Sequence, residues 1–404
     1  MKIYLVAHYA LDRQESMLRY GAWLADGFRN RGWEVETLRP SPRLGRLAAP
    51  GTSLGKWLGY LDKYLLFAPT LTRAVQRARR DKQPYAFCIT DHSHGMYLPL
   101  LEGEPHVLHC HDLIAIRAML GEFPRARLGR FGRVYQWMIL RGLRRARRVV
   151  CVSEATAQDW RRIVGTDASL TIAYNGLNHS YGPLPQETLI TALSEVGLRP
   201  QQYFLHVGSD AWNKNRDGVV ELFIAHRQRT PRDTTSLVFV GPEPSQRQQD
   251  RLSQARLTDA VTTLSQVSAE RLNTLYAGAS CLLFPSLMEG FGWPIVEANA
   301  CGTPVLTTEL APMTEVGGEA AYYLPALTDD SEHARGSWAQ VGANALADLL
   351  ERQRLAPEEV AETCLKNAGR FQAENSLNRI CETYPSNPQS VACPAKTHAM
   401  ALTQ

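Results

Sequence analysis

The sequence predicts an α/β protein in which two Rossmann-like, doubly wound domains face each other across a cleft. The chain has 404 residues, which is long for one hydrophobic core and fits two domains of ordinary size. Short apolar runs alternate with helical patterns in both halves, an order typical of parallel sheets with right-handed crossovers. Open sheets of this kind bind ligands at the carboxyl ends of their strands, so the cleft is the expected site.

The apolar runs that we interpret as strands fall into two groups along the chain. In the first half they are residues 2–8, 34–38, 86–90, 106–110, 148–153 and 170–174. In the second half they are residues 203–208, 236–241, 260–264, 280–284, 304–307 and 321–324. A proline-containing stretch at 178–202 is the expected join. We therefore expect an N-terminal domain at 1–185, a C-terminal domain at 186–369, a last helix at 370–384 and a disordered tail at 385–404.

The composition is that of a globular enzyme, with 44% hydrophobic and 21% charged residues. No apolar run approaches the roughly 18–20 residues that cross a bilayer. Residues 1–7 are too short for a signal sequence and are expected to form the first strand. The eight cysteines are scattered without a Cys-x-x-Cys pair, which indicates buried thiols in a reducing compartment. We therefore expect a cytoplasmic protein.

The most informative segment for function is 285–304, where a glycine loop lies between an apolar run and a helical pattern. Gly290 and Gly292 allow a tight bend, and Pro294 is a favourable first residue for the helix. Unpaired N–H groups and the positive end of the helix dipole converge at such a helix start. The segment is therefore a candidate site for a phosphate group.

Two carboxylates bracket this loop, Glu289 before it and Glu297 about one turn into the helix. In a site for a nucleoside diphosphate sugar, Glu297 could accept the ribose hydroxyls and Glu289 would face the sugar. The alternative is an ordinary strand–turn–helix with solvated glutamates, and the motif alone leaves that alternative open.

A wider resemblance favours the functional interpretation. The Glu-Gly-Phe-Gly loop with its Glu-x7-Glu spacing, Glu289 to Glu297, resembles the donor-binding segment of the glycosyl transferases group 1, retaining enzymes of GT-B fold. Residues 204–209 followed by Asn213-Lys214-Asn215 are similar to that family's strand and phosphate-binding lysine loop. Residues 109–113 resemble its His-Asp-Leu segment.

This resemblance implies transfer of a sugar, with retention, from a nucleotide-diphosphate sugar to an acceptor hydroxyl in polysaccharide or glycolipid synthesis. It implies catalytic roles for Glu289, His111 and Lys214. The donor would be bound by Gly208, Ser209, Asn213, Lys214, Asn215, Gly290, Phe291, Gly292, Trp293 and Glu297. His92, His94 and Asp112 are candidates for the acceptor side, although solvated loop histidines are an equal alternative for the first two. The other functional alternative is a catalytically silent or epimerase-like protein that binds nucleotide-sugars.

No metal cofactor is expected. The chain lacks the Asp-x-Asp motif by which metal-dependent sugar transferases hold a nucleotide. The histidine-rich segment 106–112 alternates between two faces of a predicted strand, which disfavours a three-ligand site. A phosphate-binding arginine that the family places shortly before Lys214 is replaced here by Trp212, and Arg216 is a candidate substitute.

A basic stretch in the first half suggests a further partner. Residues 125–148 contain nine arginines interleaved with aromatic and aliphatic residues. A second aromatic-rich stretch, 57–67, contains Lys63 and follows Lys56. A basic amphipathic helix can lie on an anionic membrane surface, here the inner face of the membrane. The alternative is a helix with one packed and one solvated face. No nucleic-acid partner is expected, since no recognised binding module is present.

Overall fold

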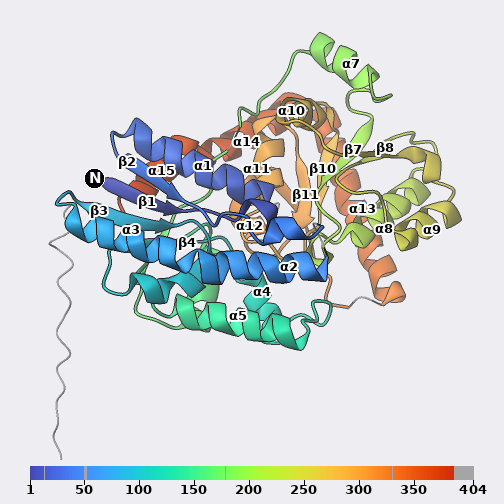
Figure 1. Cartoon of the computed structure of the whole chain (residues 1–404). Coiled ribbons are helices and arrows are strands. Elements are labelled where there is room, and N and C mark those ends of the chain that lie inside the picture. The colour runs from blue at the N-terminus through green and yellow to red at the C-terminus, as the bar shows by residue number, and fades with distance from the viewer. Residues whose placement is uncertain (13, 50–51, 178, 330, 386–404) are drawn as a thin grey trace, which may run out of the picture.

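The computed structural model describes residues 1–12, 14–49, 52–177, 179–329 and 331–385, and it contains two parallel six-stranded sheets (Figure 1). The first sheet has the order β2-β1-β3-β4-β5-β6, and the second has the order β12-β11-β10-β7-β8-β9. Helices connect successive strands, as parallel pairing requires. The predicted fold class is confirmed.

The strands occur where the apolar runs predicted them, with ends that differ by no more than one or two residues. The first sheet contains β1 (Lys2–Val6), β2 (Glu34–Leu38), β3 (Tyr85–Ile89), β4 (His106–Cys110), β5 (Arg148–Cys151) and β6 (Ser169–Ile172). The second contains β7 (Tyr203–Val207), β8 (Ser236–Val240), β9 (Val261–Leu264), β10 (Cys281–Phe284), β11 (Val305–Thr308) and β12 (Ala321–Leu324).

Helices cover both faces of each sheet. Those of the first half are α1 (Glu15–Asn30), α2 (Ser53–Tyr60), α3 (Ala68–Arg80), α4 (Ile114–Met119), α5 (Arg130–Leu143) and α6 (Glu154–Asp159). Those that follow are α7 (Gln186–Ser194), α8 (Arg216–Arg229), α9 (Gln246–Gln254), α10 (Ala269–Gly278), α11 (Trp293–Ala300), α12 (Met313–Gly317), α13 (Glu332–Leu355), α14 (Pro357–Ala368) and α15 (Ala373–Cys381). Three short segments border the site: the π-helical η3 (Leu61–Leu66), which continues α2, and the 3-10 helices η4 (His92–Leu101) and η6 (Trp212–Lys214).

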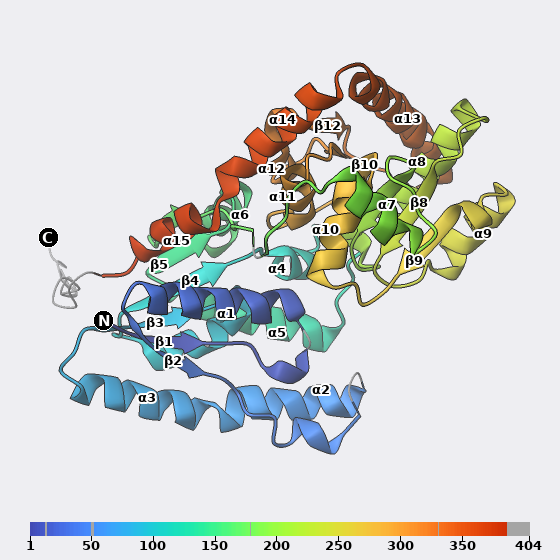
Figure 2. The ribbon, with the colours of Figure 1, turned by 90° about the horizontal axis from the view of Figure 1, so that it is seen from above.

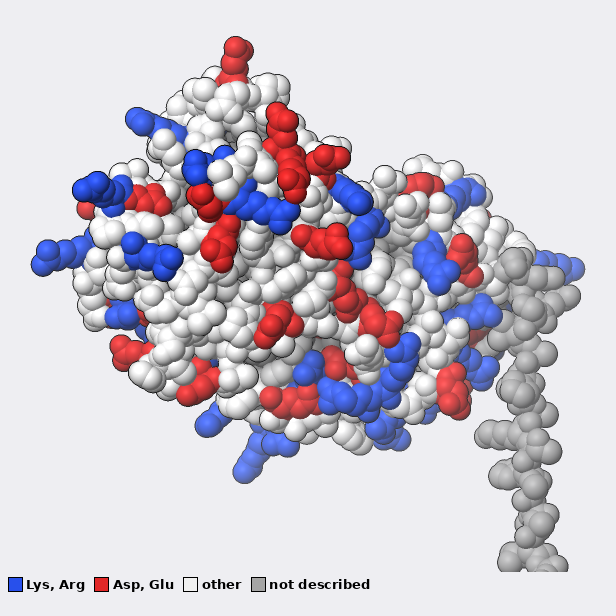
Figure 3. All heavy atoms as spheres, turned by 180° about the vertical axis from the view of Figure 1, so that it is seen from behind, with Lys and Arg blue, Asp and Glu red and all other residues white. Residues whose placement is uncertain are grey.

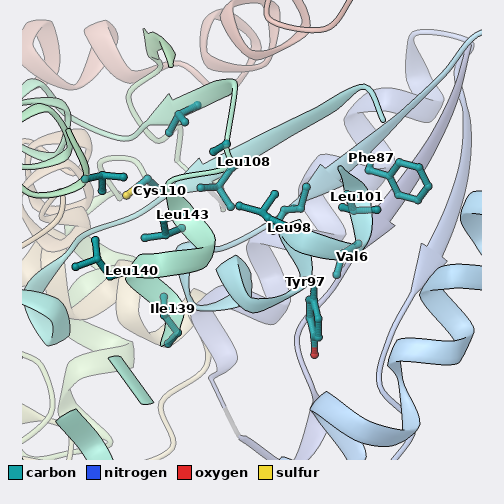
Figure 4. Packing of buried hydrophobic residues seen from close by; sticks show 14 of the residues in the cluster. Val6, Phe87, Tyr97, Leu98, Leu101, Leu108, Cys110, Ile139, Leu140 and Leu143 are labelled. Carbon is teal, nitrogen blue, oxygen red and sulfur yellow. The ribbon is translucent and has the colours of Figure 1, made fainter. Parts of the chain in front are cut away.

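Helix α5 packs tightly on the first sheet and on η4 (Figure 4). Its inner residues Ile139, Leu140 and Leu143 are buried in the same cluster as Leu98 and Leu108. The two segments approach so closely that a Cβ at Gly142 would lie 2.1 Å from the carbonyl oxygen of Gly95. The inner face of α5 is therefore buried against the first sheet and η4.

Helices α14 and α15 run from the second domain back to the first (Figure 2). Leu377 and Ile380 of α15, with Tyr384 beyond it, lie in the hydrophobic cluster that contains β1 and α1 residues. The segment between α14 and Tyr384 contains η9 (Gly369–Phe371) and α15. Apart from Pro385, the tail predicted at 385–404 lies outside the described residues.

Two further sequence expectations can be compared with the described residues. Seven cysteines are free thiols, and all of them except Cys381 are buried, in agreement with their interpretation as small apolar residues. Cys393 lies outside the described residues. None of the described helices is long and apolar enough to cross a bilayer.

Candidate active site between the two domains

The glycine loop between β10 and α11 touches the N-terminal domain. The carbonyl oxygen of Gly290 accepts hydrogen bonds from Ser153 Oγ at 2.7 Å and Thr156 Oγ1 at 3.2 Å. A Cβ at Gly290 would lie 1.9 Å from the carbonyl oxygen of His111. The absence of a side chain at Gly290 is therefore required by contact between the domains.

A second interdomain contact lies close to the first. The Glu315 carboxylate of α12 accepts hydrogen bonds from the backbone N–H groups of Glu154 and Ala155, both at 2.8 Å. A carboxylate at the start of α6 is stabilised by the helix dipole. Together with the Gly290 contacts, it holds the second domain against the carboxyl ends of the first sheet.

Helix α11 begins at Trp293, one residue earlier than Pro294. Gly292 precedes it with φ of +109°, a backbone conformation that side chains disfavour. Phe291 is buried and its ring lies 5.6 Å from that of Phe371, and Trp293 donates its indole N–H to Gly176 at 3.2 Å. Of these two predicted donor-binding residues, Phe291 is therefore buried in the core and Trp293 is partly buried.

Lys214 and Glu289 form an ion pair in the cleft. The ammonium nitrogen lies 2.7 and 2.9 Å from the two carboxylate oxygens, and both side chains are largely buried. Asn213 donates to the carbonyl oxygen of Met288 at 2.9 Å, and Asn215 donates to that of Pro285 at 3.1 Å. These two predicted donor-binding residues thus bond to the loop that carries Glu289 and fix the position of Lys214 against it.

Gly208 and Ser209 begin the loop that leads to Lys214. A Cβ at Gly208 would lie 3.5 Å from Cγ of Lys214, so this position is close to the lysine stem. Trp212, which stands in place of the family's arginine, lies with its ring 4.9 Å from that of Phe123 of the other domain. Arg216, the candidate substitute, is buried, donates to the carbonyl oxygen of Pro242 and lies over the Phe239 ring. It lines a cavity of about 300 Å³ with Trp212.

Glu297 is buried, with 7% of its surface exposed. Its Oε2 accepts a hydrogen bond of 2.7 Å from the hydroxyl of Tyr276. Burial raises the pKa of this carboxyl group, and the hydroxyls of Tyr276 and Tyr181 partly oppose that rise. The sequence did not identify Tyr276 as a partner.

A cavity of about 590 Å³ lies in the N-terminal domain, at the carboxyl ends of β1, β3 and β4. Its walls include three residues predicted for the site, His92, His111 and Asp112, together with His8 and Asp91. His94, also predicted for the acceptor side, is buried behind this wall with its ring 4.4 Å from that of His8. Another part of the wall is supplied by α2, η3 and α5 through Lys56, Tyr60, Lys63, Tyr135 and Gln136.

Burial disfavours the charged form of three histidines in and behind this wall, while the pKa of the central carboxyl group, Asp91, is lowered. Burial lowers the pKa of His8, His94 and His111. His111 Nε2 donates to the carbonyl oxygen of Thr90 at 3.0 Å, so its Nδ1 carries the lone pair in the neutral ring. Burial also opposes the charge on Asp91, but the surrounding histidines hold the pKa of that carboxyl well below its usual range. The cavity thus offers both hydrogen-bond donors and acceptors.

A second cavity, of about 260 Å³, lies between the domains and is lined by Met288, Glu289, Asp112 and Arg117. Asp112 lines both cavities and therefore connects the N-terminal one with Glu289. Arg117, which the sequence interpretation missed, pairs with Asp159 at 3.0 Å. Over the part of the chain that the structure describes, no three His, Cys, Asp or Glu side chains are grouped so that they could hold a metal ion.

Two family models match the chain, one in each half. Glycosyltransferase Family 4 matches residues 19–181, and Glycosyl transferases group 1 matches residues 194–328. Both halves of the chain thus match glycosyltransferase models, and the group 1 match lies in the second half. The resemblance inferred from the glycine loop is confirmed.

The chain is 27% identical over 193 residues to the O-antigen chain mannosyltransferase RfbU of Salmonella typhimurium, an alignment that covers 47% of the chain and 50% of RfbU. It is 26% identical over 289 residues to O-antigen chain mannosyltransferase B of Escherichia coli, covering 67% of the chain and 72% of that protein. The chain thus spans about half the length of the first relative.

Solved structures share the fold. Anabaena HepE in complex with UDP and glucose superposes with a TM-score of 0.66 at 16% identity, covering 95% of the chain and 99% of HepE. At this identity the likeness concerns the fold alone, and it matches the two facing α/β domains of this glycosyltransferase.

Proposed function

We propose that this chain is a group 1 glycosyltransferase that moves a hexosyl group from a nucleotide-diphosphate sugar to an acceptor hydroxyl, with retention at the anomeric carbon. The observation that carries the proposal is the ion pair between Lys214 and Glu289, with 2.7 Å between Nζ and Oε1. Glu289 lies on the loop that precedes the N-terminus of α11. Cationic and helix-dipole groups together suit a diphosphate leaving group. HepE, a neighbour in fold, is solved with UDP and glucose.

The ion pair suggests how the donor would enter. A bound diphosphate would take the place of Glu289 beside the Lys214 ammonium, and the freed carboxylate would face the sugar. As the anomeric C–O bond breaks, the bonding electron pair passes to the diphosphate, whose growing charge Lys214 stabilises. The acceptor oxygen then bonds to the anomeric carbon and its proton passes to a donor phosphate oxygen. Glu297, beside Tyr276, would accept ribose hydroxyls.

The acceptor would occupy the N-terminal cavity of about 590 Å³. Both ring nitrogens of His8 and Nδ1 of His92 are buried without a hydrogen-bond partner among the described residues. Such groups suit the hydroxyls of a saccharide, because unpaired buried polar atoms are costly. Two relatives are named as O-antigen chain mannosyltransferases, and we propose the same area of metabolism, cell-surface polysaccharide or glycolipid synthesis. The free buried thiols support action in the cytoplasm.

The proposal is tested with a panel of UDP-, GDP-, ADP- and dTDP-sugars in a thermal-shift experiment, followed by analysis of donor hydrolysis and transfer. We expect one nucleotide class to raise the melting temperature, because a ligand that binds only the folded state stabilises it. Lys214→Ala should abolish that rise without unfolding the protein. Stabilisation without any hydrolysis or transfer would favour a catalytically silent protein, and release of free sugar nucleotide isomers would favour an epimerase-like one.

A further inference from the structure

The first half carries apolar side chains that no part of the described fold covers. On α2 and η3 these are Leu54, Trp57, Leu61 and Leu65, which are between 42 and 63% exposed. Their spacing of three or four residues places them on one helical face. The only carboxylate within these two segments, that of Asp62, is buried and bonded to Tyr9. This face is therefore apolar and free of negative charge.

The outer face of α5 has the same character with added positive charge. Four of its apolar side chains are between 43 and 54% exposed, namely Phe131, Val134, Trp137 and Met138. They are not needed to pack α5 on the sheet, because its inner face is already buried there. Exposed arginines alternate with them, namely Arg130, Arg133, Arg141 and Arg144, and α5 contains no acidic residue. Seen from behind, Lys and Arg side chains lie along the lower edge of the molecule with Asp and Glu side chains among them (Figure 3).

These two helical faces form one continuous surface. The rings of Trp57 and Phe131 lie 4.4 Å apart, and those of Tyr60 and Tyr135 lie 5.2 Å apart. The hydroxyls of Tyr64 and Tyr135 are hydrogen-bonded at 2.5 Å. We call the exposed residues of α2, η3 and α5 named above the apolar–basic surface.

The apolar–basic surface lies directly beside the N-terminal cavity. Its helices supply five cavity residues from their other sides, namely Lys56, Tyr60, Lys63, Tyr135 and Gln136. Tyr60 and Tyr135 therefore line the cavity and also contact the residues of the surface. Anything that binds the apolar–basic surface is held next to the acceptor cavity.

We propose that the apolar–basic surface inserts shallowly into an anionic lipid bilayer and that the acceptor is a lipid-linked saccharide. Tryptophan side chains favour the headgroup level, leucines the acyl boundary, and arginines the anionic headgroups. Charge complementarity supports a bilayer over a protein, because the surface offers four arginines and no carboxylate. The choice of acceptor rests on the proposed function; the membrane contact does not. The contact extends beyond the basic stretch 125–148, since α2 and η3 supply half of the apolar residues.

The test is sedimentation with vesicles of phosphatidylglycerol and phosphatidylcholine in equal amounts, at low and high salt. We expect Leu54→Gln/Leu65→Gln to weaken binding by about tenfold or more at both salt concentrations, because leucine burial is not screened. Arg130→Gln/Arg133→Gln should weaken it by about fivefold per arginine at low salt, and far less at high salt. Matched controls on the C-terminal domain are Val341→Gln/Leu355→Gln and Arg199→Gln/Arg232→Gln, which should bind like wild type.

A second readout locates the contact. Brominated lipids should quench tryptophan fluorescence in the wild type and much less in Trp57→Phe/Trp137→Phe. Unchanged vesicle binding in Leu54→Gln/Leu65→Gln, or equal loss in the controls, would overturn the inference. A third outcome would also overturn it: the wild type forms a dimer in sedimentation velocity, Leu54→Gln/Leu65→Gln is monomeric, and no protein binds the vesicles. The surface would then be a protein interface. Donor-induced thermal stabilisation, measured on the same variants, reports separately on the proposed function.

Discussion

Glu297 offers the sharpest test of the donor site, because replacing it by Gln should weaken donor binding without lowering the stability of the unliganded protein. Replacing it by Gln retains an oxygen acceptor for the Tyr276 hydroxyl but removes the negative charge that would accept ribose hydroxyls. Each charge-assisted hydrogen bond contributes about 1.5–3 kcal/mol. Loss of one such bond weakens donor binding by about 10- to 150-fold.

The stability of the unliganded protein should change in the other direction. Burial raises the pKa of the Glu297 carboxyl, so the folded protein holds this proton more tightly than the unfolded chain does. The stabilisation from that proton is complete below the unfolded pKa and is lost as pH rises through the raised folded pKa. Above the raised pKa the wild type carries a buried charge that Glu297→Gln lacks, and there the variant should be at least as stable. Glu297→Ala should instead lose about 1–3 kcal/mol, because the buried Tyr276 hydroxyl is left without a partner.

The assay combines calorimetric titration of the stabilising nucleotide sugar with urea unfolding at neutral and acidic pH. Tyr276→Phe is the matched control: it keeps the carboxylate, removes a hydroxyl that lowers its pKa, and should lose donor affinity mainly as pH falls. An unchanged donor dissociation constant in Glu297→Gln would refute the ribose role. A loss of stability in Glu297→Gln as large as that in Glu297→Ala would refute the account of the buried charge.

The remaining predictions concern the reacting sugar, the metal and the domain contact. Glu289→Gln should lower kcat by about tenfold or more without weakening donor binding, and equal losses in both would contradict a role at the sugar. Activity should survive excess EDTA, because Lys214 and the start of α11 meet the diphosphate charge; full loss restored by magnesium or manganese would overturn this. Gly290→Ala places a Cβ 1.9 Å from the His111 carbonyl oxygen and should force the domains apart, with an increased radius of gyration in solution scattering and lower kcat/KM but retained donor binding. An unchanged radius and rate would show that the loop yields without moving the domain.

Most of the fold could be predicted because the sequence patterns that indicate strands and helices are local. The strands are short apolar runs, and the second-half sheet is buried on both faces, which leaves continuous hydrophobic stretches such as Cys281–Phe284. The helix α11 starts at Trp293, one residue before the predicted start at Pro294. Proline is favourable at the start of a helix, but the boundary is set by the positive φ of Gly292. Boundaries depend on backbone conformation more than on residue type.

The partners of the site residues could not be predicted, because they are set by contacts between distant segments. Lys214 and Glu289 are 75 residues apart and meet only when the loops after β7 and β10 adjoin. Tyr276 reaches Glu297 from a neighbouring helix. His94 follows His92 by two residues, yet it turns away from the cavity in the tight η4 helix. Residue types identified the candidates, and packing decided which of them face the cavity.

Gly290 changes the interpretation of the motif from which the function was first inferred. The segment was expected to bind a phosphate, but the space of the missing Cβ of Gly290 is taken by the carbonyl group of His111 from the other domain. The adjacent residue, Glu289, holds Lys214, which the diphosphate would claim. In the proposed function, donor binding would therefore act at Glu289 and the domain contact at Gly290, two successive residues of one short loop. Mutation should consequently separate the domain contact at Gly290 from donor affinity at Lys214. A double-mutant cycle with Gly290→Ala and Lys214→Ala measures whether the two are coupled.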